Sequence, residues 1–200
     1  MPSVWLQHHF WDGNAQWHDR VVLEITRLHF VVPPFLAFAL WLRRRALFYR
    51  FAASMLVLSF AGAITFYLFP AAPPWAASQA GILGHVTKLT DAHPAVSGVP
   101  VQRDAGFSLA GLVDPNPYAA IPSLHGGYAF LVFLFVAMLA WRTPWRRIVV
   151  PLAALYPLLQ SFAVVYTGNH YVVDLLICFA YASAALFGVL WFWRRRGWPE

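Results

Sequence analysis

Residues 171–193 read YVVDLLICFAYASAALFGVLWFW, an almost unbroken apolar run with one carboxylate, Asp174, in its first turn. About 20 predominantly apolar residues suffice for a helix to cross the hydrocarbon core of a bilayer. His170 stands directly before the run, four residues from Asp174, so the two share one helix face. A second apolar run, 121–141, begins IPSLHGG and carries His125 at the corresponding place. Ionisable groups are costly at a membrane span, so these residues indicate a functional site.

The composition identifies a bilayer as the solvent of this chain. Of its 200 residues, 60% are hydrophobic and 11% are charged, whereas soluble domains carry about 25% charged residues. The formal net charge is +6, which by itself can suggest nucleic acid. Most of the basic residues stand at the ends of apolar runs, however, and nucleic-acid binding needs a clustered basic face with aromatic or polar readers. We therefore expect no nucleic-acid partner.

The apolar runs predict an all-α fold, a polytopic membrane bundle of about five transmembrane helices with short helices at the outer face. The expected spans are 21–42, 51–69, 121–141, 148–166 and 171–193.

The first expected span is the weakest of the five. It holds Glu24, Arg27 and His29 near its start and the pair Pro33-Pro34 in its middle. The alternative is an interfacial helix that enters the membrane only from Phe30.

The remaining segments divide the chain into an interfacial part and a membrane domain. Tryptophan favours the headgroup level of a bilayer, so we expect residues 1–20 to form an interfacial segment and residues 21–200 the membrane domain. The connection 70–120 is long for a structureless loop. It should hold short helices over the bundle, where it can cover a substrate.

Three arginine clusters predict the orientation in the membrane. Ten of the fourteen basic residues lie at 43–50, 142–147 and 194–196, each at the end of an apolar run. The positive-inside rule assigns these ends to the cytoplasm. We therefore expect an integral protein of a plasma or inner membrane with a cytoplasmic C-terminus. His125 and His170 then face the extracytoplasmic side.

The predicted start of each histidine-bearing helix suits a phosphate. A helix N-terminus offers unpaired N–H groups and about half a positive charge, so two converging N-termini form an anion site. Ser123 adds a hydroxyl donor near His125. Gly126 follows His125, and we expect its missing side chain to let a phosphate approach the backbone.

The spacing of His170 and Asp174 predicts a nucleophile with an orienting carboxylate. A hydrogen bond from one ring nitrogen to Asp174 fixes the tautomer and leaves the other nitrogen free to attack. His125, on another helix, can protonate the departing oxygen as a general acid. We expect neither a cofactor nor a metal. The alternative is a zinc site built on the two histidines and Asp174, but no further strong ligand is placed with them. His29 is interpreted as an amphipathic anchor near the interface.

At these residues the chain resembles the type-2 phosphatidic acid phosphatase superfamily, most closely the branch of fungal inositol phosphorylceramide synthase. The resemblance rests on residues 116–125 (NPYAAIPSLH) and 166–174 (YTGNHYVVD), with support from 69–75 and 10–14. It implies a membrane helical bundle and metal-independent transfer at the outer face through a phosphohistidine. Carried over, His170 is the nucleophile, Asp174 its orienting partner and His125 the general acid.

The resemblance has one gap, the basic residues that bind phosphate. The phosphatase branch has a lysine–arginine–proline element that is missing here, and an arginine six residues before the nucleophile where this chain has Val164. Lys88 and Arg103 are the nearest substitutes. Asn116 and Tyr118 are either turn residues or substrate contacts.

The sequence therefore predicts a membrane enzyme acting on a lipid phosphate or diphosphate. The first hypothesis is a lipid phosphatase working through a phosphohistidine. The alternative is a phosphotransferase that moves a phosphoryl headgroup, such as phosphoinositol, to a ceramide, diacylglycerol or similar alcohol. A third possibility is a non-catalytic lipid-binding or transport protein, although binding alone needs no nucleophile–carboxylate pair.

Overall fold

The structure is a computed structural model that describes residues 1–92 and 120–197. Its regular elements within those ranges are all α-helices. They are α1 (Pro2–Phe10), α2 (Trp17–Arg43), α3 (Arg45–Leu68), α4 (Pro74–Gln79), α5 (Leu89–Ala92), α8 (Leu124–Ala140), α9 (Arg146–Tyr166) and α10 (Val172–Arg195).

The helices confirm the expected polytopic membrane bundle. Four of those described, α2, α3, α9 and α10, are long and apolar enough to cross a membrane. The fifth, α8, is apolar but has 17 residues, a length of about 26 Å against a hydrocarbon core of about 30 Å. Its first turn carries His125.

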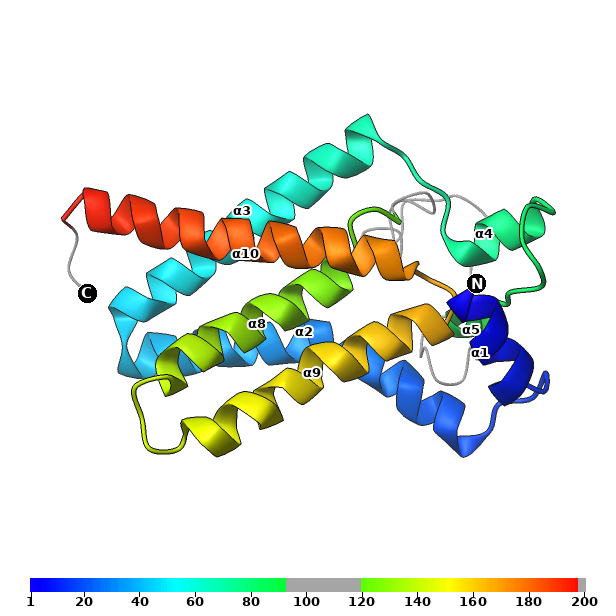
Figure 1. Cartoon of the computed structure of the whole chain (residues 1–200), viewed down its shortest axis with the longest axis horizontal. Helices are drawn as coiled ribbons and strands as arrows, with labels where there is room; N and C mark the ends of the chain where they lie inside the picture. The colour runs from blue at the N-terminus through cyan, green and yellow to red at the C-terminus, as the bar shows by residue number, and fades with distance from the viewer. Residues whose placement is uncertain (93–119, 198–200) are drawn as a thin grey trace.

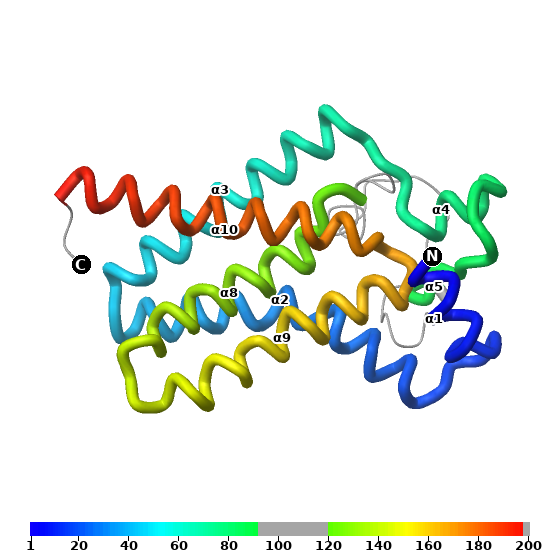
Figure 2. The backbone as a smooth tube through the Cα atoms, in the orientation of Figure 1, coloured from blue at the N-terminus to red at the C-terminus, as the bar shows by residue number. Residues whose placement is uncertain are grey.

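The weakest expected span is a single continuous helix, α2. It begins at Trp17, so the expected boundary between residues 20 and 21 falls inside a helix. The reason is a cap that the hydrophobicity pattern does not reveal, in which the Gln16 backbone N–H donates to the Asp19 carboxylate at 2.9 Å. Pro33 and Pro34 lie inside α2. Figure 2 shows the tube of α2 changing direction part-way along its length, as prolines inside a helix cause.

The short helix α8 lies at the centre of the bundle, where it packs against α2, α3, α9 and α10 (Figure 1). Its Leu131 and Phe135 are fully buried, together with Leu58 of α3 and Leu186 of α10. The longer helices expose large apolar side chains around this core. That pattern suits a protein whose outer surface faces lipid tails.

Close packing of α8 on α10 depends on two glycines. A Cβ at Gly126 would lie 2.4 Å from Leu175 Cδ2, and a Cβ at Gly127 would lie 2.1 Å from Cys178 Sγ. Small residues let membrane helices approach closely. The first turn of α8 is thereby held against the first two turns of α10.

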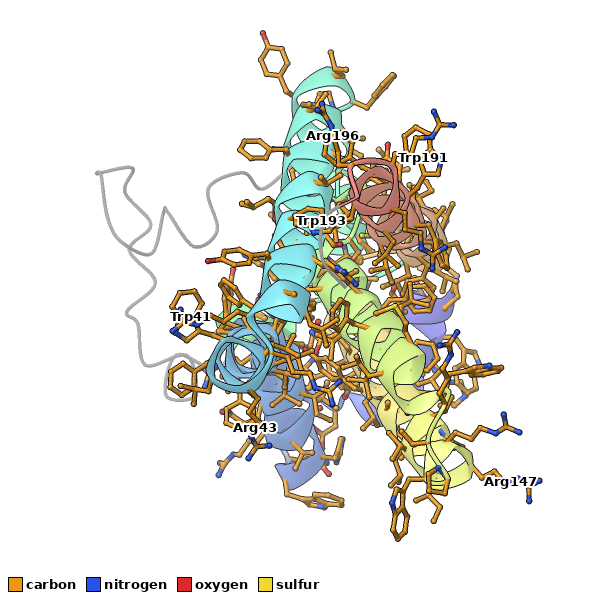
Figure 3. All side chains as sticks on the ribbon, turned by 90° about the vertical axis from the view of Figure 1, so that its left-hand side faces the viewer. Trp41, Arg43, Arg147, Trp191, Trp193 and Arg196 are labelled. Carbon is orange, nitrogen blue, oxygen red and sulfur yellow. The ribbon has the colours of Figure 1, made fainter. Side chains whose placement is uncertain are left out.

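The two ends of the bundle differ in character. One end carries the α2–α3 junction, the α8–α9 turn and the end of α10, and Figure 3 shows Arg43, Arg147 and Arg196 there with Trp41, Trp191 and Trp193. The other end carries α1, α4, α5 and the N-terminus (Figure 1). The arginine clusters therefore lie at one end, and the starts of α8 and α10 lie toward the other.

Candidate active site

The structure brings His125 and His170 into direct contact. His125 Nδ1 lies 3.1 Å from His170 Nε2, although the residues are 45 positions apart. His125 is half-buried in the first turn of α8, and His170 is 5% exposed just before α10. The Ser123 backbone N–H donates to the Asp174 carbonyl at 3.3 Å, which ties the two helix starts together.

Hydrogen bonds fix the tautomers of this histidine pair. His170 Nδ1 lies 2.9 Å from the Ala120 carbonyl oxygen. A carbonyl only accepts, so Nδ1 carries the hydrogen and Nε2 of the neutral ring carries the lone pair. His125 Nδ1 must then be the donor in the contact with His170. The nucleophilic nitrogen expected from the sequence is therefore Nε2, and the neighbouring proton is on His125.

Asp174 lies beside His170 but contributes differently from the expectation. Its Oδ2 accepts from the Tyr171 backbone N–H at 2.7 Å and lies 3.6 Å from His170 Nδ1. The short bond to His170 Nδ1 belongs to the Ala120 carbonyl, so a backbone group sets the tautomer and Asp174 adds negative charge nearby. The carboxylate is fully buried. The same side chain also caps α10.

Ser123 and Gly126 lie at the start of α8, next to the histidine pair. Ser123 is the N-cap residue, and its hydroxyl oxygen accepts from the Gly126 backbone N–H at 3.4 Å. The missing side chain of Gly126 makes room for Leu175, a packing role that depends on the contact between α8 and α10 and is not visible in the local sequence. Phosphate contact at these two residues stays a prediction.

A third histidine, His29 of α2, reaches the same place. Its ring centroid lies 4.2 Å from that of His125, with the planes at 65°. His29 is 8% exposed, so it is a buried side chain and not an interfacial anchor. The pattern of α2 gave no signal for this, because only the folded bundle sets which face of α2 meets α8.

The turn that carries His170 is held by segments from far along the chain. Gly168 has φ +78°, a conformation that favours glycine, and a Cβ there would lie 3.0 Å from the Thr87 carbonyl oxygen. The Leu89 backbone N–H donates to the Thr167 carbonyl at 3.2 Å, and that of Trp75 donates to the Gly168 carbonyl at 3.2 Å.

Gln7 completes this support from α1. Its amide nitrogen donates to the Tyr166 carbonyl at 2.7 Å and to the Thr87 carbonyl at 2.9 Å, and its oxygen accepts from the Thr87 backbone N–H at 2.8 Å. Gln7 and Ser3 are buried on one face of α1. In the sequence, the signal for this buried face is a pair of polar residues four apart in a short helix.

Of the four remaining residues expected to contact substrate, the described part of the structure includes only Lys88. Lys88 lies one residue before Leu89, with its ammonium 3.4 Å from Asp91 Oδ1 and 5.1 Å from the centre of the Trp75 ring. Substrate contact at Lys88 stays a prediction. Arg103, Asn116 and Tyr118 lie outside the described residues.

The clustered histidines do not form a metal-binding arrangement. Within residues 1–92 and 120–197, no group of three or more His, Cys, Asp or Glu side chains could hold a metal ion. The described geometry, a lone pair facing a proton donor, is instead that of acid–base and nucleophilic chemistry.

Comparison with known proteins identifies the family. A family model described as the PAP2 superfamily matches residues 3–188. This chain belongs to the PAP2 superfamily. The match covers nearly the whole chain and confirms the resemblance inferred from its histidine motifs.

A curated relative supports the PAP2 assignment. The chain is 30% identical over 159 residues to a phosphoinositol dihydroceramide synthase of Bacteroides thetaiotaomicron, covering 75% of this chain and 47% of the relative. The chain thus spans about half the length of the curated relative that it matches. No solved structure matches the chain. The PAP2 family and the four long apolar helices together indicate an integral membrane protein.

Proposed function

We propose that this PAP2 protein cleaves a lipid phosphate ester through a phosphohistidine formed on His170. The observation that carries the proposal is the contact of His170 Nε2 with His125 Nδ1 at 3.1 Å, while the Ala120 carbonyl holds the other nitrogen of His170 at 2.9 Å. A lone pair with a fixed direction and an adjacent proton are the two groups that displacement at phosphorus needs.

In the first step, the lone pair of His170 Nε2 attacks phosphorus and the bond from phosphorus to the lipid oxygen breaks. His125, protonated at the outset, gives one proton to that oxygen, so a neutral alcohol leaves. Because His125 Nδ1 contacts His170 Nε2 in the free enzyme, phosphorus must enter between the two rings. The N-termini of α8 and α10, joined through Ser123 and Asp174, supply partial positive charge for the phosphoryl oxygens.

In the second step, an oxygen nucleophile attacks phosphorus and the bond to Nε2 breaks. Neutral His125 removes the proton of the attacking hydroxyl and is thereby restored to its protonated form. Water as the nucleophile gives a lipid phosphatase. Hydrolysis needs no further binding site, and for that reason it is the first candidate.

Transfer to an alcohol is the second candidate, and a specific observation favours it. The relative from Bacteroides is named a phosphoinositol dihydroceramide synthase. In that case the alcohol of a lipid or similar acceptor replaces water in the second step, and the first step is unchanged.

The sidedness of the site is part of the proposal. The arginine clusters gather at one end of the bundle (Figure 3), and the positive-inside rule places that end in the cytoplasm. The histidine pair lies toward the other end, which we assign to the extracytoplasmic side.

The deciding experiment compares the wild-type protein with His170→Ala in detergent on phosphatidic acid and on a polyprenyl diphosphate. We expect phosphate release from the wild type and loss by a factor of about 10³ or more in the variant. A parallel reaction with ³²P-labelled substrate, quenched in alkali, should trap an acid-labile phosphoprotein only where His170 is present.

Two outcomes redirect or overturn the proposal. If the donor is consumed only when a ceramide, diacylglycerol or inositol acceptor is added, and the phosphoryl group then appears on that acceptor, the enzyme is a transferase. If a folded wild-type protein forms neither product nor phosphoprotein with any lipid phosphate donor, or if His170→Ala is fully active, the proposed site is wrong.

A further inference from the structure

His29 is a buried histidine that the mechanism above does not use. It lies on α2, and its ring packs edge-to-face on the ring of His125 with centroids 4.2 Å apart. The face of α2 that contacts α8 therefore brings a third imidazole to the proton donor of the site. The titratable side chains around His125 in the described structure are His29 from α2, His170 from the α9–α10 turn and, behind His170, Asp174 of α10.

The position of the His29 ring is determined by the backbone of α2. His29 Nδ1 donates to the Thr26 carbonyl, which also accepts from the Gln160 amide of α9 at 3.1 Å. Gln160 is fully buried. The His29 ring is thus anchored at the contact between α2 and α9, and its orientation does not depend on His125.

The catalytic cycle gives this contact a specific use. In the free enzyme, His125 is held on one side by its hydrogen bond to His170. Substrate phosphorus has to separate these two rings before Nε2 can attack, so His125 loses that hydrogen bond when it must deliver its proton. Apart from the contact with His170, the described ring contact of His125 is the one with His29.

We propose that His29 is a positioning residue of the active site, holding the His125 ring in the orientation that delivers its proton to the leaving oxygen. This inference rests on the proposed function, because it assigns His29 a role in the acid step of that reaction. Misplacing a reacting group by about 1 Å can cost a factor of about 10² in rate. In the first step, the effect of His29 should therefore appear only where the leaving oxygen needs the proton of His125.

The test varies the leaving group. One substrate is a lipid phosphate with an alkyl alcohol as leaving group, which needs a proton. The other is the matching p-nitrophenyl phosphate ester, whose phenolate leaves without one. We expect His29→Ala to lower kcat/KM, which reports formation of the phosphohistidine, by about 10-fold to 100-fold on the alkyl ester. On the nitrophenyl ester we expect kcat/KM to change by less than about 3-fold.

Further variants separate positioning from simple packing. His29→Phe keeps an aromatic ring against His125 and should recover most of the activity on the alkyl ester, whereas His29→Gln keeps an N–H donor without a ring and should not. The double variant His29→Ala/His125→Ala should be no slower than His125→Ala, because His29 acts through His125. Val31→Ala, on an exposed part of the same helix, is the control for general effects on α2.

Three results would overturn the inference. One is an equal loss of kcat/KM on both esters in His29→Ala. Another is a double variant whose kcat/KM is lower than that of His125→Ala by the full factor of the single variant. The third is wild-type activity in His29→Ala. Failure of the proposed function looks different, because the wild type itself would then cleave neither ester and form no phosphohistidine.

Discussion

At the residue scale, Asp174 contributes to both the helix and the site. Its Oδ2 caps the Tyr171 backbone N–H at 2.7 Å and lies 3.6 Å from His170 Nδ1. Its Oδ1 is buried and has no hydrogen-bond partner among the described residues. A buried carboxylate with one oxygen unsatisfied is costly for stability. This stability cost is explained by a role in the reaction. The negative charge of Asp174 would stabilise the His170 ring when phosphorylation gives that ring positive character.

The substitution Asp174→Asn tests this explanation because it removes the negative charge and keeps the helix cap. The amide oxygen can still accept from the Tyr171 backbone, so the cap survives, but the charge is lost. We expect kcat for phosphate release to fall by a factor of about 10² to 10⁴ while the melting temperature changes by only a few degrees. Asp174→Ala is the matched variant that removes both functions, and it should also lose the cap, about 1 kcal/mol of stability. A charge-independent role would leave Asp174→Asn nearly as active as the wild type.

The histidine pair also determines a pH dependence. His170 must be neutral to attack and His125 must be protonated to donate, so the active form of the pair holds one extra proton. Activity should be lost at low pH as His170 is protonated and at high pH as His125 loses its proton, which gives a bell-shaped profile of kcat/KM. The two limbs belong to the coupled pair and not to single residues. A rate that rises without a maximum from pH 5 to pH 9 would contradict the assigned roles.

At the element scale, the α8–α10 contact decides where the two histidines lie. Gly126 and Gly127 leave no side chains between these helices, and Leu175 and Cys178 occupy the space. Because the first turn of α8 carries His125 and α10 follows His170, the helix spacing affects the distance between the rings. A change of a few tenths of an ångström here should be felt at the site.

Gly127→Ala measures the tightness of this contact. The added Cβ would lie 2.1 Å from Cys178 Sγ, so we expect a destabilisation of about 1–3 kcal/mol, seen as a lower melting temperature in detergent, with reduced activity. Gly127→Ala/Cys178→Ala should recover most of both, because the next nearest atoms, at 3.4 and 3.6 Å, are ordinary contacts. Gly188→Ala in α10 meets nothing within 4 Å and should be neutral or slightly stabilising. A stable Gly127→Ala would show that the helices can separate without cost.

The helix α1 contributes to the same end of the bundle through Gln7. Three hydrogen bonds from one side chain join α1 to Thr87 and to Tyr166 at the end of α9. The turn that follows Tyr166 leads directly to His170. The N-terminal segment is therefore part of the scaffold that positions the nucleophile.

At the scale of the whole molecule, the bundle is polarised along its length. Arginines and tryptophans lie at one end (Figure 3). Some of them form cation–π pairs: Arg195 Cζ lies 4.4 Å from the centre of the Trp191 ring, and Arg45 Cζ lies 4.8 Å from that of Trp41. Such pairs suit the headgroup level of a bilayer. The opposite end collects the histidine pair and the short helices.

Cysteine labelling measures the resulting orientation. In a Cys178→Ala background, we expect Gln79→Cys at the end of α4 to react with a membrane-impermeant maleimide in intact cells. Arg147→Cys, at the arginine end, should react only after permeabilisation. The reverse pattern would place the active site in the cytoplasm and contradict the positive-inside assignment, whereas labelling of both sites in intact cells would indicate mixed insertion.

The sequence by itself determined the membrane bundle, the helices and the two histidine motifs, because hydrophobicity, helix length and short spacings are local properties. Only the tertiary structure decided that His29 contacts His125, that the Ala120 carbonyl and not Asp174 takes the short hydrogen bond from His170, and that Gly126 makes room for Leu175. These facts depend on which faces of separate helices meet. That choice is made by side-chain packing across the whole bundle, and no local pattern encodes it.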